Sequence, residues 1–200
     1  TTNWGLGYFK YNACDYCDDV LAETADVTFG DAWIPKSVND GEGCNVIVVR
    51  NRDVQGLFDR HRDELVLHDS DSAEVYQSQA GGFRHRRQGL AYRLHVHEQR
   101  GEWTPTKRVK PSLEGIGERR QQIYAMRTTL KNESFVAFRK AVDANDFNEF
   151  KKTMKPIERA YTRLSVPLKK RLVIGYKKTM KRVLPPGLTR KLKSMLSHHK

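Results

Sequence analysis

Charge is distributed unevenly along the 200 residues, and this division limits how the chain can fold. Residues 1–82 contain six Lys or Arg against fifteen Asp or Glu, whereas residues 83–200 contain thirty against nine. Residues 151–200 alone hold sixteen basic side chains, with Glu158 as the one acid. Because 38% of residues are hydrophobic and 30% are charged, part of the chain is expected to lie outside a packed core.

The acidic part shows the patterns of strands and short helices. Residues 25–29 alternate as a half-buried strand does, and the β-branched run 45–50 predicts a strand buried on both faces. A helix capped by Asp53 and ending near residue 64 should follow, and then a strand over 65–68. Together these elements predict a compact β-α-β unit.

The basic part shows mainly helical patterns. After a basic turn at 81–87 and a strand over 90–96, the two prolines in 101–111 indicate a linker. Helices are predicted over 116–130, 134–143, 146–154 and 166–184. The expected fold is α+β, or α/β: a small mixed β-sheet with flanking helices, followed by a mainly helical basic C-terminal region. Because the Gly-x-Gly-x-x-Gly fingerprint is absent from the sequence, no doubly wound dinucleotide fold is expected. The expected domains are a core at 1–100, a helical extension at 101–164 and a basic amphipathic tail at 165–200.

The sequence also bears on where the protein works. No apolar run approaches the roughly 20 residues needed to cross a bilayer, and the N-terminal sequence has no signal-peptide pattern. Three cysteines make a disulfide framework improbable, so a cytoplasmic setting is expected. The first residue, Thr1, is not an initiator Met, and we therefore expect a fragment or a processed product.

Cys14 and Cys17 form the motif with the most chemical content. Two cysteines separated by two residues let both sulfurs approach one metal, a spacing common at zinc and iron–sulfur sites. Such sites usually need four ligands, and Cys44 opens an apolar strand where it is interpreted as a core thiol. The alternatives are a thioredoxin-like dithiol or an incidental pair on a loop. The acidic neighbours Asp15, Asp18 and Asp19 argue against the dithiol because they disfavour a thiolate. The same carboxylates should lower the reduction potential of a bound cluster.

A longer string of motifs resembles a known family. The motifs are Cys14-Asp15-Tyr16-Cys17-Asp18-Asp19, Glu23-Thr24-Ala25-Asp26-Val27, Gly30-Asp31-Ala32-Trp33 and Val46-Ile47-Val48-Val49-Arg50. In this order they resemble the C-terminal domain of the coenzyme F(420) hydrogenase/dehydrogenase beta subunit family. The sequences of residues 81–87 and 90–93 are similar to those of bacterial members of this family. The resemblance covers residues 8–100 and, more weakly, the stretch to about 160.

The resemblance implies an iron–sulfur flavoprotein. Members use FAD and a 4Fe-4S cluster, and some use coenzyme F(420), to pass electrons between a two-electron carrier and one-electron centres. Cys14 and Cys17 match the pair that supplies cluster ligands, and further ligands should lie in an N-terminal region that this chain lacks. The expected function is a portion of such an oxidoreductase, with an electron donor or acceptor protein, or a small-molecule carrier, as partner.

Two further groups are candidates for cofactor binding. Gly30 and Asp31 form an expected turn where backbone amides can approach a ligand, the alternative being a structural turn with a buried Trp. Arg84, Arg86 and Arg87 could bind a flavin diphosphate or the acidic tail of a deazaflavin, the alternative being a solvated turn. His95 and His97 share one face of the strand expected there, but a third metal ligand is missing from that pattern.

The basic tail suggests a second class of function. Leu168, Leu172, Tyr176, Met180 and Leu184 recur every four residues between many cations. Such a helix could lie on an anionic membrane surface or an acidic partner, or form an ordinary charged surface. A non-catalytic module bound in this way, peripheral at the membrane, is therefore the alternative function. Nucleic-acid binding is disfavoured because aromatic side chains for base stacking are few.

Overall fold

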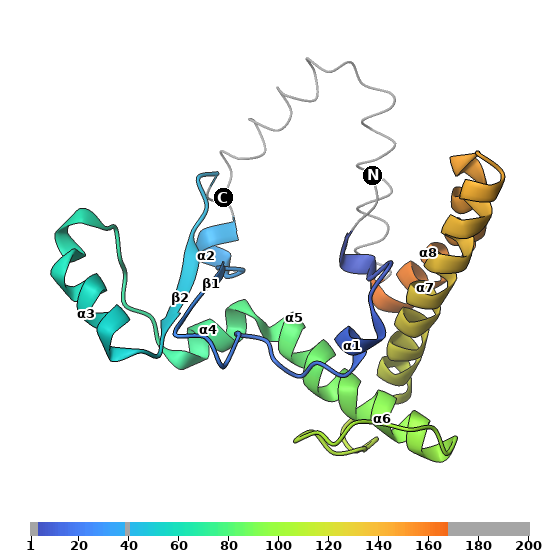
Figure 1. The fold of residues 1–200 in the computed structure, drawn as a ribbon, viewed down its shortest axis with the longest axis horizontal. Coiled ribbons are helices and arrows are strands. Elements are labelled where there is room, and N and C mark those ends of the chain that lie inside the picture. Colours follow the sequence, from blue (N-terminus) through green and yellow to red (C-terminus); the bar gives the residue numbers. More distant parts are fainter. Residues whose placement is uncertain (1–3, 39–40, 168–200) are drawn as a thin grey trace, which may run out of the picture. The chain divides into compact units, whose positions relative to one another are not determined.

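The computed structural model describes residues 4–38 and 41–167, shown in Figure 1. The chain forms two compact units, one made of Thr1–Phe9 and Ala125–Lys200 and the other of Lys10–Tyr124. We call them the helical unit and the cysteine unit. A two-stranded sheet with flanking helices, followed by a helical C-terminal region, confirms the expected α+β class.

The sheet of the cysteine unit pairs β1 (Val27–Asp31) with β2 (Asn45–Val49) in antiparallel register. Both strands were predicted, and α2 (Pro35–Val38) lies in their connection. Val27 faces Val49 across the pair, and Asp31 faces Asn45. Since the sheet of the described residues has only these two strands, β2 is half-buried, and the prediction that it is buried on both faces is wrong.

The predicted helix after β2 is α3 (Arg52–Arg60), followed by the short 3-10 turn η2 (Arg62–Glu64). Its cap is Asn51, whose side-chain oxygen accepts the Asp53 amide at 2.8 Å, so Asp53 stands in the first turn and does not cap the helix. Residues 65–68 form no strand, and Val66 is almost fully exposed. The β-α-β prediction is therefore wrong, because β2 pairs with the strand before it.

Helices occupy the stretch where a turn and another strand were expected. They are α4 (Ser72–Ser78), α5 (Ala80–Phe83), the π-helical segment η3 (Arg84–Gln88) and α6 (Gly89–Gln99). The turn predicted at 81–87 and the strand predicted at 90–96 are both wrong. Leu90 and Leu94, one helical turn apart, are both buried, which explains why this segment is a helix. His95 and His97 consequently lie on a helix and do not share a face.

Tyr124 packs against the start of α6. Its hydroxyl donates to the side-chain oxygen of Gln88 at 2.6 Å, and its ring lies against Gly89, where an added Cβ would be 3.2 Å from a ring carbon. The glycine thus permits close approach of α6 to the tyrosine. Residues 101–111 contain no helix or strand and belong to the cysteine unit.

The helical unit is built on the C-terminal part of α7 (Glu118–Asp143) and on α8 (Phe147–Ser165). The helices predicted at 116–130 and 134–143 are one helix, and the helix predicted at 146–154 continues eleven residues further, to Ser165. Asn145, with a φ of 46°, ends the first helix, and Asp146 caps the second by accepting the Asn148 amide at 2.8 Å. The core contains Leu130, Ala137, Ala141, Phe150 and Met154.

The N-terminal segment, which includes the 3-10 turn η1 (Trp4–Leu6), packs on this hairpin. The Phe9 amide donates to the Ser134 hydroxyl at 2.9 Å, and the Tyr8 hydroxyl bonds to the Glu158 carboxylate. Burial and the neighbouring carboxylate raise the pKa of Tyr8 above its ordinary value. The helix predicted at 166–184 lies almost entirely outside the described residues. Among those that are described, no helix combines the length and the apolar character that a membrane span requires.

Candidate cysteine site

The two cysteines lie on a single helical turn of the cysteine unit. Cys14 belongs to α1 (Asn12–Asp15), and its amide donates to the Tyr11 carbonyl at 3.0 Å. Cys17 follows the helix end, where the Tyr16 amide donates to the Ala13 carbonyl at 3.2 Å. Both thiols are free; Cys14 is exposed and Cys17 is half-buried. The motif therefore presents its thiols on the tight turn that the spacing predicts.

A guanidinium group from η3 contacts the second cysteine. Nη1 of Arg86 donates to Sγ of Cys17 at 3.0 Å, and the same sulfur contacts the Asp19 carbonyl oxygen at 3.7 Å. A positively charged hydrogen-bond donor therefore lies on the sulfur of Cys17.

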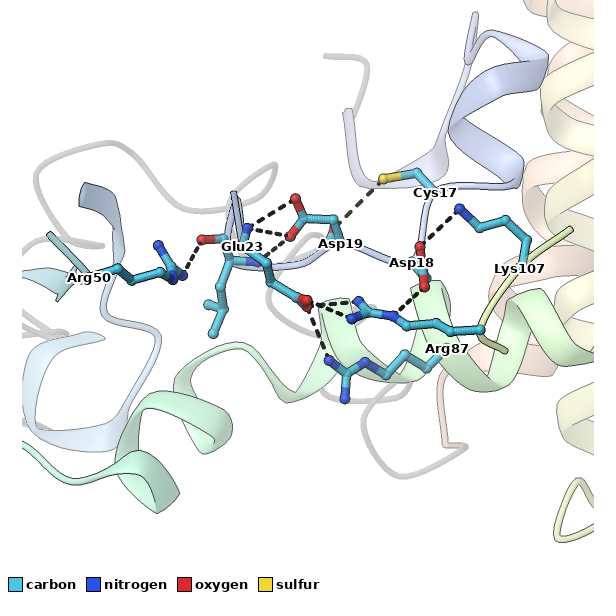
Figure 2. A network of polar contacts seen from close by, with 9 residues as sticks. Cys17, Asp18, Asp19, Glu23, Arg50, Arg87 and Lys107 are labelled. Atoms are coloured by element: carbon cyan, nitrogen blue, oxygen red, sulfur yellow. Dashed lines mark hydrogen bonds and ion pairs between the residues drawn. The ribbon is translucent and has the colours of Figure 1, made fainter. Parts of the chain in front are cut away.

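The carboxylate after this cysteine is paired within the chain, as Figure 2 shows. Asp18 is only 7% exposed, and its two oxygens contact Nζ of Lys107 at 3.1 Å and Nε of Arg108 at 2.5 Å. Burial opposes ionisation of Asp18, but the hydrogen bonds from both cations outweigh it and lower its pKa.

Arg108 extends the pairing to a second carboxylate. Its Nη1 and Nη2 lie 2.6 and 2.9 Å from the two oxygens of Glu23, and Arg87 approaches the same group at 3.3 Å. The bidentate Arg108 contact lowers the pKa of Glu23 despite some burial, and the two carboxylates raise the pKa of Arg108. We call Asp18, Glu23, Lys107 and Arg108 the carboxylate clamp.

Other hydrogen bonds fix the backbone between the two cysteines and after them. The Asp19 carboxylate accepts the amides of Leu21 and Glu23 at 3.1 Å each, and Arg50 donates to the Leu21 carbonyl at 2.9 Å (Figure 2). Arg93 from α6 donates twice to the Asp15 carbonyl, at 3.0 and 2.7 Å. Residues distant in the sequence thus hold the segment that follows the motif.

These contacts change the expected electrostatics. The sequence suggested that the negative charges of Asp15, Asp18 and Asp19 act on the thiols. Instead Asp15 pairs with Lys10 at 3.1 Å, Asp18 is in the clamp and Asp19 bonds to backbone amides. Each carboxylate therefore has partners of its own, and the side chain that donates to the Cys17 sulfur is a cation.

The predicted glycine–aspartate turn lies inside a strand. Gly30 and Asp31 belong to β1, and the Asp31 carbonyl accepts from the Gln79 side chain at 2.9 Å and the Ser78 hydroxyl at 3.3 Å. The alternative of a turn with a buried Trp is also wrong, since Trp33 is 57% exposed. Both site candidates, Gly30 and Asp31, thus lie beside α4.

The arginine triplet divides between two roles. Arg86 and Arg87 brace the cysteine segment, and the Arg87 guanidinium also lies 4.7 Å from the centre of the Phe83 ring. The Arg84 side chain is exposed. Because η3 is helical, neighbouring positions point in different directions, so the three guanidinium groups do not form one cradle.

Two cations of the site, Lys107 and Arg108, were not predicted, and Arg50 and Arg93 were noted only as members of longer motifs. The excess of acid around the cysteines was a signal that basic partners were needed. Cys44 is exposed, so its interpretation as a core thiol is wrong. Within the described part of the chain, no group of three or more His, Cys, Asp or Glu side chains could hold a metal ion.

Comparison with known proteins relates the cysteine segment to a family. Residues 2–74 match the family described as the C terminus of the coenzyme F(420) hydrogenase/dehydrogenase beta subunit. The match confirms the resemblance for this segment, which contains both cysteines, and it ends before the arginine triplet. No curated protein and no solved structure matches the chain significantly.

Proposed function

We propose that Cys14 and Cys17 are two thiolate ligands of a 4Fe-4S cluster in an oxidoreductase of the coenzyme F(420) hydrogenase/dehydrogenase beta subunit type. The family match indicates an oxidoreductase-related role for the segment that carries them. The observation that carries the proposal is the 3.0 Å contact of Arg86 with Cys17 Sγ, within a segment held by ion pairs.

The residues present fit part of such a ligand set. Two free thiols on one turn are the donors that iron–sulfur clusters use, and the described residues provide no third ligand beside them. The remaining ligands must come from another segment or another chain. A cluster bound here would carry single electrons.

Each element of the site has a task in this proposal. The helical turn α1 carries Cys14 and Cys17 follows it directly, Arg86 donates a hydrogen bond to the Cys17 sulfur, and the carboxylate clamp holds the following backbone in place. Because the protein positions a cofactor and tunes its potential, a rigid and charge-balanced loop is the contribution expected of it.

The flavin part of the proposal rests on the family. We propose FAD or coenzyme F(420) as the two-electron carrier, with Gly30, Asp31 and the exposed Arg84 as contacts. Arg86 and Arg87 already bond to Cys17 and Glu23, so their use for a diphosphate would require those bonds to break.

Anaerobic reconstitution with iron and sulfide tests the cysteine assignment. We expect a visible iron–sulfur absorption when the chain is reconstituted together with the segment or partner chain that supplies the remaining ligands, and Cys14→Ser and Cys17→Ser should each reduce it strongly. Cys44→Ser is the matched control because it removes the third thiol, which is also exposed. No absorption in the unaltered protein with that segment or chain present, or equal absorption in all three variants, would contradict the proposal.

A further inference from the structure

Four phenylalanine side chains gather on the surface of the helical unit. Phe9, Phe135, Phe138 and Phe147 are 40, 45, 51 and 53% exposed. The Phe9 ring lies 5.6 Å from each of the α7 rings, Phe135 and Phe138, and stacks at 5.9 Å on the buried Phe150. Phe147 stacks on the same buried ring at 5.4 Å, so the four exposed rings are linked through Phe9 and Phe150. We call them the aromatic patch.

The patch rests on ordered structure. Phe135 and Phe138 are joined on the same face of α7 by the exposed Val142, at helical positions i, i+3 and i+7. The backbone of Phe9 is fixed by its bond to Ser134. A cluster of large exposed apolar side chains of this kind marks a candidate interaction site.

Cations border the aromatic patch. Arg139 lies four residues after Phe135 and therefore on the same side of α7. On α8, Nζ of Lys151 lies 5.0 Å from the centre of the Phe147 ring, and Lys155 follows one helical turn later. Glu133 and Glu149 each lie two positions from a patch residue and so face other directions.

We propose that the aromatic patch binds the surface of an anionic phospholipid bilayer. The rings would enter the boundary between headgroups and acyl chains, and Arg139, Lys151 and Lys155 would contact the phosphates. An apolar face bordered by Lys and Arg is the pattern of proteins that lie in this interface.

Charge favours an anionic bilayer over two other possible binding partners of the patch, a second copy of the unit and the tail of the same chain. Residues 125–167 contain nine Lys or Arg and five Asp or Glu, and residues 168–200 contain eleven and none. A second copy of the unit, or the tail of the same chain, would therefore bring positive charge towards a positive border. An anionic surface is attracted to both parts of the chain.

Sedimentation with vesicles tests the proposal on the full chain. We expect binding to vesicles of phosphatidylcholine with phosphatidylserine, and little binding to phosphatidylcholine alone. Phe138→Ser combined with Phe147→Ser should weaken binding by about tenfold or more, because two apolar side chains that would enter the lipid are lost. Both are already half exposed, and circular dichroism should show that the helices remain.

Val136→Ser is the matched control. Val136 is equally exposed on α7 but faces away from Phe135 and Phe138, so binding should not change. Failure of the unaltered chain to bind, or equal binding by the double variant, would overturn the proposal. Self-association that the double variant abolishes, without any vesicle binding, would assign the patch to a second copy and would likewise overturn it.

Discussion

Replacing Asp18 by Asn perturbs the carboxylate clamp at its most buried member. The change keeps the size of the side chain but removes its charge, and one oxygen becomes an amide that donates hydrogen bonds. In the structure, the two oxygens receive Lys107 at 3.1 Å and Arg108 at 2.5 Å. After the substitution, at least one cation therefore faces a donor or a weaker, neutral acceptor.

The magnitude follows from burial and from the remaining contacts. A hydrogen bond to a charged group contributes about 1.5–3 kcal/mol, and two are affected. Arg108 is half exposed and keeps its ion pair with Glu23, so losing its contact with Asp18 costs little because solvent screens the charge. Lys107 is mostly covered, so the loss of its contact with Asp18 is screened less. We therefore expect the segment after Cys17 to lose about 2–3 kcal/mol of local stability, which increases opening about 30- to 150-fold.

Amide hydrogen exchange measures this opening where it occurs. The amides of Leu21 and Glu23 are bonded to the Asp19 carboxylate, so they report on the segment itself. Asp69→Asn is the matched control, because that side chain is 93% exposed and pairs only with Arg62 in the described structure. Exchange at the two amides that changes less than about threefold in Asp18→Asn would refute the reasoning.

Three further predictions test other parts of the structure. The folded-state pKa values of Asp18 and Glu23 lie below the ordinary values of 3.8 and 4.5. The stability that these two carboxylates contribute is therefore present above the ordinary values and is lost as the pH falls through the lower folded-state values. Amide exchange measured from pH 6 to pH 3 should show that the amides of the segment after Cys17 lose their protection only at the acidic end. In reconstituted protein, Arg86→Gln should lower the reduction potential by removing a hydrogen bond to a ligand sulfur, whereas Arg84→Gln, with the same change of charge, should shift it less in a redox titration. Gly89→Ala should destabilise the cysteine unit by about 1–2 kcal/mol in urea unfolding because its Cβ would press on the Tyr124 ring, whereas Gly81→Ala, which meets no atom within 4 Å, should not.

Local patterns predicted the elements whose partners are near in the sequence. The alternation in 25–29 and the β-branched run in 45–50 sufficed for both strands, and helical periodicity sufficed for α3, α7 and α8. The segment from Leu90 to Val96 was misassigned because a short run fits both alternation and helical spacing. What decides it is burial of Leu90 and Leu94 on a helix whose Gly89 lies against Tyr124, a residue distant in the sequence.

The site was predicted as far as single motifs allow. The spacing of Cys14 and Cys17 revealed the thiols, and the arginine triplet contained the partner of one of them. The bond of Arg86 to Cys17 joins residues 69 positions apart, and that of Arg108 to Asp18 joins residues 90 apart. Pairings between residues so far apart depend on the folded chain. The sequence therefore shows where the charged side chains are, but not which acidic side chain pairs with which basic one.

The iron and acid-labile sulfide that copurify under anaerobic conditions with the chain and the segment or partner that supplies the remaining ligands test the cluster assignment most directly. We expect both to be present in the unaltered protein and in Cys44→Ser, and both to be lost when Cys14 and Cys17 are replaced together by Ser. Iron and sulfide retained by that double variant, or absent from the unaltered protein while all three thiols titrate as free, would contradict it.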